Sequence, residues 1–330
     1  MIPLGPRRPM RLAGWCSRIV VVLGSLAVVP LLAQSQADPW NFDGESSGET
    51  LASVLGPQVS DIVATIAFVT LALVSFFRKS IPLKYATLCF SLVYLGALRS
   101  MLMSVTDIFR LIDLSLPPIE YSVAWYLVAG LTVASTVLWG RLYCGRICAF
   151  GALTQLLDAV VPTRLRREPP PWIEERAALL KYGILALVLA YYVATDDAAV
   201  YRYVEPFWMF SGSATPLLWG MLAVLLLATL VVRNLYCRFL CPVGALLGLV
   251  AQVSTVFRIK RWKECRTCRI CERACEWGAI RGPRIVRSEC VRCDDCERLY
   301  ADTSTCVHWV VLQRRSSRPP APLGNTTRSP

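Results

Sequence analysis

The sequence predicts a mostly α, polytopic helical membrane protein that ends in a small C-terminal α+β domain. The first observation is composition, because 55% of the 330 residues are hydrophobic and the mean hydropathy is +0.48. Soluble domains are less apolar than this, so a membrane class is expected. The second observation is a series of apolar segments, each near the ~20 residues that cross a bilayer as a helix. The third is a dense group of cysteines close to the C-terminus.

The apolar segments divide the chain into regions. Three arginines within residues 7–11 precede an apolar run over 12–33, and Ser35-Gln36-Ala37 follows as a small-residue cleavage pattern. This order predicts a signal peptide or signal anchor over 1–37, followed by a short periplasmic segment over 38–58. A transmembrane region over 59–262 brings the total to about six spans. Its five spans are predicted over 59–77, 81–103, 122–140, 177–194 and 216–232.

The charged loops alternate along this region. Lysine and arginine gather in the loops over 78–84, 141–167 and 233–263, whereas the intervening loops over 107–120 and 196–205 are mainly acidic. Basic loops stay on the cytoplasmic side of a membrane. The pattern therefore predicts a multi-pass protein of the bacterial inner membrane whose C-terminal domain lies in the cytoplasm.

Eight cysteines near the C-terminus form two ferredoxin-type motifs. The first motif is C-x2-C-x2-C-x3-C, and the second repeats the triplet with its last cysteine after a longer gap. In two-cluster ferredoxins the fourth cysteine of each motif binds the other cluster. Zinc sites use four ligands and usually pairs of cysteines, so two triplets favour iron. The spacing predicts a 2[4Fe–4S] ferredoxin-like domain over 263–312 and a disordered tail over 313–330.

The crossed pattern assigns the ligands of both clusters. Cluster 1 is predicted at Cys265, Cys268, Cys271 and Cys306, and cluster 2 at Cys290, Cys293, Cys296 and Cys275.

A second cysteine pattern recurs inside the transmembrane region. Residues 142–153, LYCGRICAFGAL, match residues 235–246, LYCRFLCPVGAL, at an offset of 93. Cysteines four residues apart lie on one helix face, so the pairs Cys144/Cys148 and Cys237/Cys241 are expected to converge. They form a candidate membrane redox or metal motif that would hold a further Fe–S centre, copper or a reversible disulfide. The alternative is a packing motif that uses cysteine as a small apolar residue.

Composition also excludes other functions. The net charge is +12, but no basic stripe is interleaved with aromatic residues, so nucleic-acid binding is not expected. His308 is the single histidine, and a haem held by paired histidines needs more. The cluster motifs contain no nucleophile–base pair, so no catalytic residues are predicted. An electron-transfer subunit is favoured over a stand-alone enzyme.

These motifs resemble the C-terminal part of the NosR/NirI-type membrane polyferredoxins, which include NapH-like proteins. The resemblance runs from about residue 59 to Cys306 and is carried by the two C-x3-C motifs, by Val204-Glu205-Pro206-Phe207 and by residues 289–306, ECVRCDDCERLYADTSTC. It implies six spans, two cytoplasmic [4Fe–4S] clusters and electron delivery toward periplasmic enzymes or their maturation. Two departures stand out. Ala149 replaces the family's proline, and residues 38–58 are too short for the family's periplasmic FMN-binding domain.

Together these features predict a membrane-bound iron–sulfur protein that relays electrons between the cytoplasm or quinol pool and a periplasmic redox protein or flavoprotein. The alternative is a redox-sensing regulator or maturation factor for a periplasmic copper reductase. A third hypothesis is a metal-handling membrane protein that uses the four repeat cysteines. The donor, the acceptor and the direction of electron flow stay open.

Overall fold

The computed structural model describes residues 51–118, 123–162, 165–167, 169–198, 201–207, 215–256, 259, 268, 270–282 and 284–316. The predicted signal segment, most of the predicted periplasmic segment, Cys265 and residues 317–330 lie outside these ranges. In chain order the elements are α2 (Leu51–Arg78), α3 (Ile81–Phe90), η2 (Ser91–Leu98), α4 (Val105–Ile112), α5 (Val123–Trp139), η4 (Tyr143–Ile147), α6 (Ala149–Val160), α7 (Pro171–Thr195), α8 (Tyr201–Val204), α9 (Pro216–Val231), η8 (Tyr236–Leu240), α10 (Pro242–Gln252), α11 (Ile270–Ala274), β1 (Ile280–Arg281), β2 (Arg284–Ile285), α12 (Asp295–Ala301) and α13 (Val307–Ser316).

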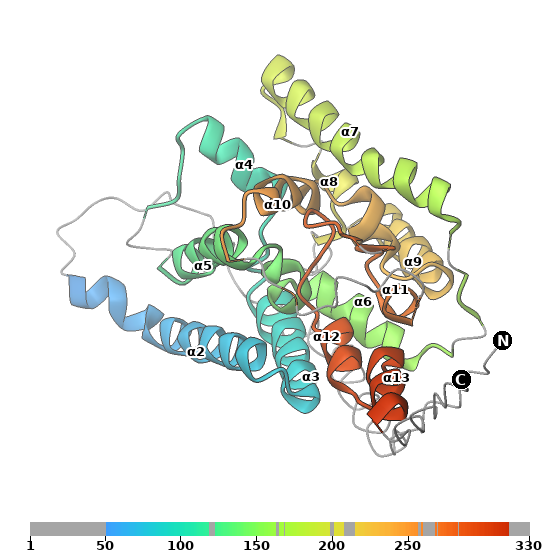
Figure 1. The fold of residues 1–330 in the computed structure, drawn as a ribbon. Coiled ribbons are helices and arrows are strands. Elements are labelled where there is room, and N and C mark those ends of the chain that lie inside the picture. The colour runs from blue at the N-terminus through green and yellow to red at the C-terminus, as the bar shows by residue number, and fades with distance from the viewer. Residues whose placement is uncertain are drawn as a thin grey trace, which may run out of the picture.

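The molecule is mostly helical, as predicted. Figure 1 shows α2 and α7 at opposite edges, with α12 and α13 next to each other. All five predicted spans of the transmembrane region are helical. Three helices in the described part of the chain are long and apolar enough to cross a membrane, namely Gln58–Arg78, Ile81–Leu98 and Trp172–Thr195. The spans predicted over 122–140 and 216–232 form the shorter apolar helices α5 and α9, so the count of six stays a prediction.

The second span ends earlier than predicted. Its helix stops at Leu98 rather than at residue 103: Arg99 caps the helix and pairs with Asp61 on α2, and Ser100 has a left-handed φ of +50°. A charged side chain at a helix end reaches a partner at lower cost than one inside an apolar span.

The sequence repeat is also a structural repeat. The order α5–η4–α6 in the first half matches α9–η8–α10 in the second. In each half an apolar helix leads into a π-helical turn, closed by a 2.9 Å hydrogen bond from the N–H of Cys148 to the carbonyl of Tyr143, or from the N–H of Cys241 to the carbonyl of Tyr236. A new α-helix then begins directly after the second cysteine of each pair. Single π-turns are rare and occur frequently at functional sites.

The hydrophobic core joins the membrane helices to the C-terminal module, by which we mean the described residues from 268 to 316. The four repeat cysteines belong to one cluster of buried residues that also contains Trp277, Val291 and Cys293. Trp277 is 3% exposed and Val291 is 1% exposed. The C-terminal module is therefore packed onto the repeat rather than attached to it by chain connectivity alone.

The C-terminal module is small. Its strands β1 and β2 pair antiparallel, with Ile280 opposite Ile285, and they supply the only β-structure in the described residues. The indole N–H of Trp309 on α13 donates to the carbonyl of Tyr300 on α12 at 2.9 Å, which holds the two helices together. Helix α13 extends to Ser316, so residues 313–316 are helical although the predicted tail began at 313.

Candidate metal centres

The residues predicted to bind cluster 2 lie around one cavity. Cys275, Cys290, Cys293 and Cys296 all line it. Cys275 directly follows α11, Cys290 and Cys293 lie in the loop before α12, and Cys296 lies in its first turn. The structure thus brings a cysteine of the first motif to the triplet of the second, in the crossed arrangement expected from the spacing. Their role as ligands stays a prediction.

The loop that carries the triplet turns sharply between cysteines. Arg292 and Asp294 have φ angles of +57° and +66°, a left-handed conformation that non-glycine residues seldom adopt. Such strain persists where the surroundings enforce it, and it clusters at ligand sites. Burial raises the pKa of the Cys290 and Cys296 thiols to about 12 each, so without metal these thiols stay protonated at neutral pH. A bound metal would supply the positive charge that stabilises the thiolates.

The number of thiols around this cavity matches what a cubane needs. Among the described residues, no three His, Cys, Asp or Glu side chains are grouped as ligands of one metal ion. Four thiols that surround a cavity suit a cubane of several irons, which is held by four cysteines.

The residues predicted for cluster 1 are only partly described. Cys265 lies outside the described ranges, whereas Cys268, Cys271 and Cys306 are partly buried. The structure therefore does not show whether these four converge. It does show how the chain approaches Cys306.

A tight turn built on Asp302 positions Cys306. One Asp302 carboxylate oxygen accepts from the N–H and the hydroxyl of Ser304, at 2.9 and 2.6 Å, and the other accepts from the hydroxyl of Thr305 at 2.7 Å. The hydroxyl of Ser304 and then that of Thr305 hold the pKa of Asp302 at about 2. The N–H of Cys306 donates to the Asp302 carbonyl at 3.0 Å, so the same residue anchors both ends of the turn.

The four repeat cysteines also line one cavity. Cys144, Cys148, Cys237 and Cys241 meet there, together with Arg141 and Phe207. The convergence expected from the repeat is therefore present, but the helical geometry behind it was predicted wrongly. Cys144 lies in the π-turn, whereas Cys148 has an extended backbone with ψ of 120° and caps α6. Cys241 caps α10 in the same way, so neither pair lies on one continuous helix face.

Two helices begin at this cavity, so their N-termini face the cysteines. Helix α10 starts with Pro242, and the N–H of Gly244 donates to the Cys241 sulfur at 3.2 Å. Helix α6 starts with Ala149 in the equivalent position. Proline suits the first position of a helix but is not required there, so the alanine leaves the local structure intact. The partial positive charge of both N-termini favours negative charge on the thiols.

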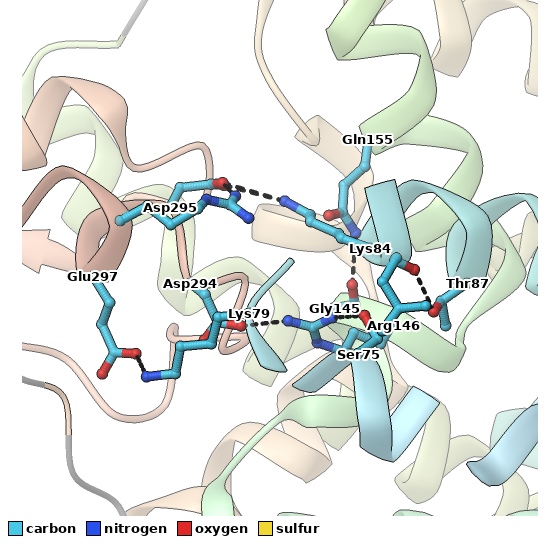
Figure 2. A network of polar contacts seen from close by, with 12 residues as sticks. Ser75, Lys79, Lys84, Thr87, Gly145, Arg146, Gln155, Asp294, Asp295 and Glu297 are labelled. Atoms are coloured by element: carbon cyan, nitrogen blue, oxygen red, sulfur yellow. Dashed lines mark hydrogen bonds and ion pairs between the residues drawn. The ribbon is translucent and has the colours of Figure 1, made fainter. Parts of the chain in front are cut away.

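Buried ion pairs dock the C-terminal module onto the membrane helices (Figure 2). Arg146 of η4 pairs with Asp294, and the two side chains are 1% and 2% exposed. Arg146 also donates to the hydroxyl of Ser75 on α2 at 2.5 Å. Two further pairs lie nearby, Lys84 with Asp295 at 3.2 Å and Lys79 with Glu297. Two of the acidic partners lie between Cys293 and Cys296 and the third directly follows Cys296, so the pairs hold this loop, residues 290–297, in place.

A second set of contacts joins the four-cysteine cavity to the same module. Gly145 lies so close to the Val291 carbonyl that a Cβ at this position would clash with it. Gly145 is adjacent to Cys144, and Val291 is adjacent to Cys290. The backbones that carry the two cysteine sets are therefore in direct contact.

Sequence reasoning missed the charged residues that make this interface. Lys181 is fully buried within a predicted span and pairs with Glu289 at 2.5 Å. An ionisable residue inside an apolar segment usually has a buried partner of opposite charge, so the sequence could have predicted an ion pair at Lys181. Arg146 lies inside the first C-x3-C motif. The positive-inside rule already explains a basic residue there, so the sequence offers no reason to expect its ion pair with Asp294.

Two family models match the parts of the chain that carry these cysteines. The family described as a 4Fe-4S binding domain (Fer4_5) matches residues 121–168 and 213–262, and the only cysteines in those ranges are the four repeat cysteines. The NosR family matches residues 263–317, which contain all eight cysteines of the ferredoxin-type motifs. No solved structure matches this chain.

Curated relatives carry the same names. "Regulatory protein NosR" of Pseudomonas aeruginosa is 32% identical over 262 residues, which cover 74% of this chain and 36% of that protein. "Protein NirI" of Paracoccus denitrificans is 32% identical over 210 residues, 61% of this chain and 30% of that protein. The chain thus spans about a third of the length of these relatives. It is therefore related to NosR and NirI and carries a 4Fe-4S binding domain.

Proposed function

We propose that this chain is a membrane-bound electron-transfer protein that relays electrons between the cytoplasm or quinol pool and a periplasmic redox partner. The observation that carries the proposal is the direct contact between the two segments that carry the cysteine sets, made where Gly145, next to Cys144, meets Val291, next to Cys290. Redox centres exchange electrons when they lie close together in a rigid frame. The buried ion pairs of Arg146, Lys84 and Lys79 supply that frame.

Twelve cysteines are assigned to three centres. Cluster 1 is bound by Cys265, Cys268, Cys271 and Cys306, cluster 2 by Cys275, Cys290, Cys293 and Cys296, and a membrane centre by Cys144, Cys148, Cys237 and Cys241. Iron–sulfur clusters supply one-electron chemistry when bound. The protein holds the thiolates, excludes water from them and fixes their spacing.

The membrane centre is assigned as iron–sulfur rather than copper. Its four cysteines are the ones contained in the ranges matched by the 4Fe-4S binding family. Their cavity also holds Arg141 and receives two helix N-termini, which favour a centre of net negative charge. Copper(I) also prefers soft thiolate ligands, so metal analysis must distinguish the two.

The test is anaerobic purification followed by iron, sulfide and copper quantification and electron paramagnetic resonance. Two cubanes alone correspond to about eight irons per chain. We expect more than this in the wild type, with the excess lost in the double variant Cys144→Ser, Cys237→Ser. The Cys293→Ser variant should instead lose a cluster of the C-terminal module. Equal iron in wild type and double variant would refute the membrane centre, and copper in place of the excess iron would reassign it.

The cytoplasmic location of the C-terminal module is part of the proposal. Lys79, Lys84 and Arg146 belong to the basic segments that the positive-inside rule places in the cytoplasm, and all three pair with this module. A reporter enzyme that is active only in the periplasm, fused after Lys263, should therefore stay inactive. Activity of that fusion would reverse the topology.

A second candidate function is redox-sensing regulation or maturation of a periplasmic reductase. It is favoured by the name "Regulatory protein NosR" carried by relatives from two organisms. A relay and a sensor respond differently to loss of cluster 2. In the Cys293→Ser variant, lost reductase turnover at unchanged reductase expression supports the relay. Normal turnover with altered expression supports the sensor.

A further inference from the structure

One cation is buried at the wall of the four-cysteine cavity. Arg141 is 1% exposed, and its Nη2 lies 3.8 Å from the Cys144 sulfur. Gly244, on the opposite half of the repeat, leaves room for the guanidinium, because a Cβ there would lie 2.7 Å from Nη2. The side chain therefore reaches across the repeat and lies against both pairs of cysteines.

The other end of this guanidinium contacts the C-terminal module, at the two residues that precede Cys290. Its Nη1 donates to the Ser288 carbonyl at 2.7 Å and lies 3.6 Å from the Glu289 carboxylate. The ammonium of Lys181 lies 2.5 Å from the same carboxylate, and Lys181 is fully buried. Two cations thus share one anion on the side of the cavity where Arg141 lies.

The second half of the repeat has no such charge at the matching position. At the offset of 93 residues, Asn234 corresponds to Arg141. Asn234 is also fully buried but neutral. The cation is therefore a feature of one half of the repeat, on the side where Ser288 and Glu289 pack.

We propose that Arg141 is a positioning residue that raises the reduction potential of the centre bound by the four repeat cysteines. This inference rests on the proposed function, since it assumes a redox centre at those cysteines. A thiolate-bound iron–sulfur centre carries net negative charge and gains one electron on reduction. A buried positive charge nearby stabilises the reduced form, because attraction is strong where water is excluded. Net charge and hydrogen bonds to sulfur are the means by which proteins set these potentials.

The signs of the expected shifts follow directly. Arg141→Met removes the cation, so the midpoint potential of the membrane centre should become more negative. Glu289→Gln removes the shared anion, so the potential should become more positive. Arg141→Lys keeps the charge and should remain nearer the wild type than Arg141→Met. Lys181→Met should shift the potential in the same direction as Arg141→Met but by less, since Lys181 does not line the cavity.

The experiment is a redox titration of the purified full chain, followed by electron paramagnetic resonance. The membrane-centre signal is identified as the one that disappears in the double variant Cys144→Ser, Cys237→Ser. Lys79→Met is the control, because it removes a cation that also pairs with the C-terminal module, at Glu297, but Lys79 is 38% exposed and does not line the four-cysteine cavity. It should leave the membrane-centre potential near that of the wild type.

Opposite shifts in midpoint potential for Arg141→Met and Glu289→Gln support the proposal. A general disruption of packing would not shift the potential in opposite directions according to the charge removed. Unchanged potentials, or shifts of the same sign, overturn it. If Arg141→Met does not fold, the signs for Glu289→Gln and Lys181→Met decide the question. A double cysteine variant that loses no signal would instead refute the membrane centre itself, so the two failures are distinguishable.

Discussion

Arg146 should be the strongest single anchor of the C-terminal module. The Arg146→Met change leaves the Asp294 carboxylate buried without its cation, and both side chains are at most 2% exposed. Removing one partner of a buried ion pair costs about 3–5 kcal/mol, mainly because the remaining charge is uncompensated. We therefore expect the free energy of local opening of the cluster-2 loop to fall by about this amount.

Two neighbouring pairs provide a graded comparison. Lys79 is 38% exposed although its partner Glu297 is only 7% exposed, so water can replace part of the lost interaction. Lys79→Met should therefore cost less than Arg146→Met, closer to the roughly 1 kcal/mol of an exposed pair. Lys84 is 6% exposed, but its partner Asp295 keeps a second cation in Arg298. The Lys84→Met variant should therefore fall between the other two.

The assay is hydrogen–deuterium exchange of residues 284–301 in the purified chain, which reports the free energy of local opening. A double-mutant cycle with Asp294→Asn isolates the pair, because the double variant no longer buries an unpaired charge. We expect the double variant to be less destabilised than the sum of the two single changes. Equal protection in Arg146→Met and Lys79→Met, or strict additivity in the cycle, would refute the reasoning.

Three further outcomes follow from the same geometry. Gly145→Val should separate the two cysteine-lined cavities, because the new side chain clashes with the Val291 backbone. Overpacking of this kind costs about 1–3 kcal/mol. We expect slower electron exchange between the centres, measured by freeze-quench spectroscopy, and an unchanged rate would contradict the prediction. Asp302→Ala should loosen the turn before Cys306 and lower iron content by up to about four per chain, the content of one cubane, whereas the exposed-face change Arg287→Ala should not. Cys275→Ser should remove the same resonance as Cys293→Ser; removal of the other cluster's signal would refute the crossed assignment.

The sequence predicted the helical segments, and it predicted that the four cysteines of the repeat lie together, as do those assigned to cluster 2. Hydrophobic segment length locates helices, because a bilayer sets that length, and all five segments of the transmembrane region are helical. The repeat predicted that Cys144, Cys148, Cys237 and Cys241 meet, and they line one cavity. These patterns lie within short stretches or recur in the sequence, so one chain is enough to detect them.

The sequence could not predict how the cysteine pairs are presented. An i, i+4 spacing on a regular helix suggests one face, but the chain forms a π-turn and restarts its helix after Cys148 and Cys241. The extended caps depend on tertiary packing, including the approach of Gly145 to Val291. The docking pairs were missed for a similar reason, since Arg146 and Asp294 are 148 residues apart.

The docking surface makes the two halves of the repeat chemically different. Gly145 and Arg146 of the first half correspond to Arg238 and Phe239 of the second. In the first half, Gly145 and the buried Arg146 contact the loop of Cys293. In the second half, Arg238 pairs with Glu174 on α7 at 2.5 Å. A symmetric fold would allow the C-terminal module to dock on either half. The glycine that meets Val291 and the arginine that pairs with Asp294 occur in the first half only, so the loop of Cys293 docks on that half. The second half contacts the module elsewhere, where Arg238 lies against Gly278 and Gly248 lies against Ser288. If the four repeat cysteines hold a redox centre, as proposed, the shortest backbone route to it from the Cys293 loop runs through the first half.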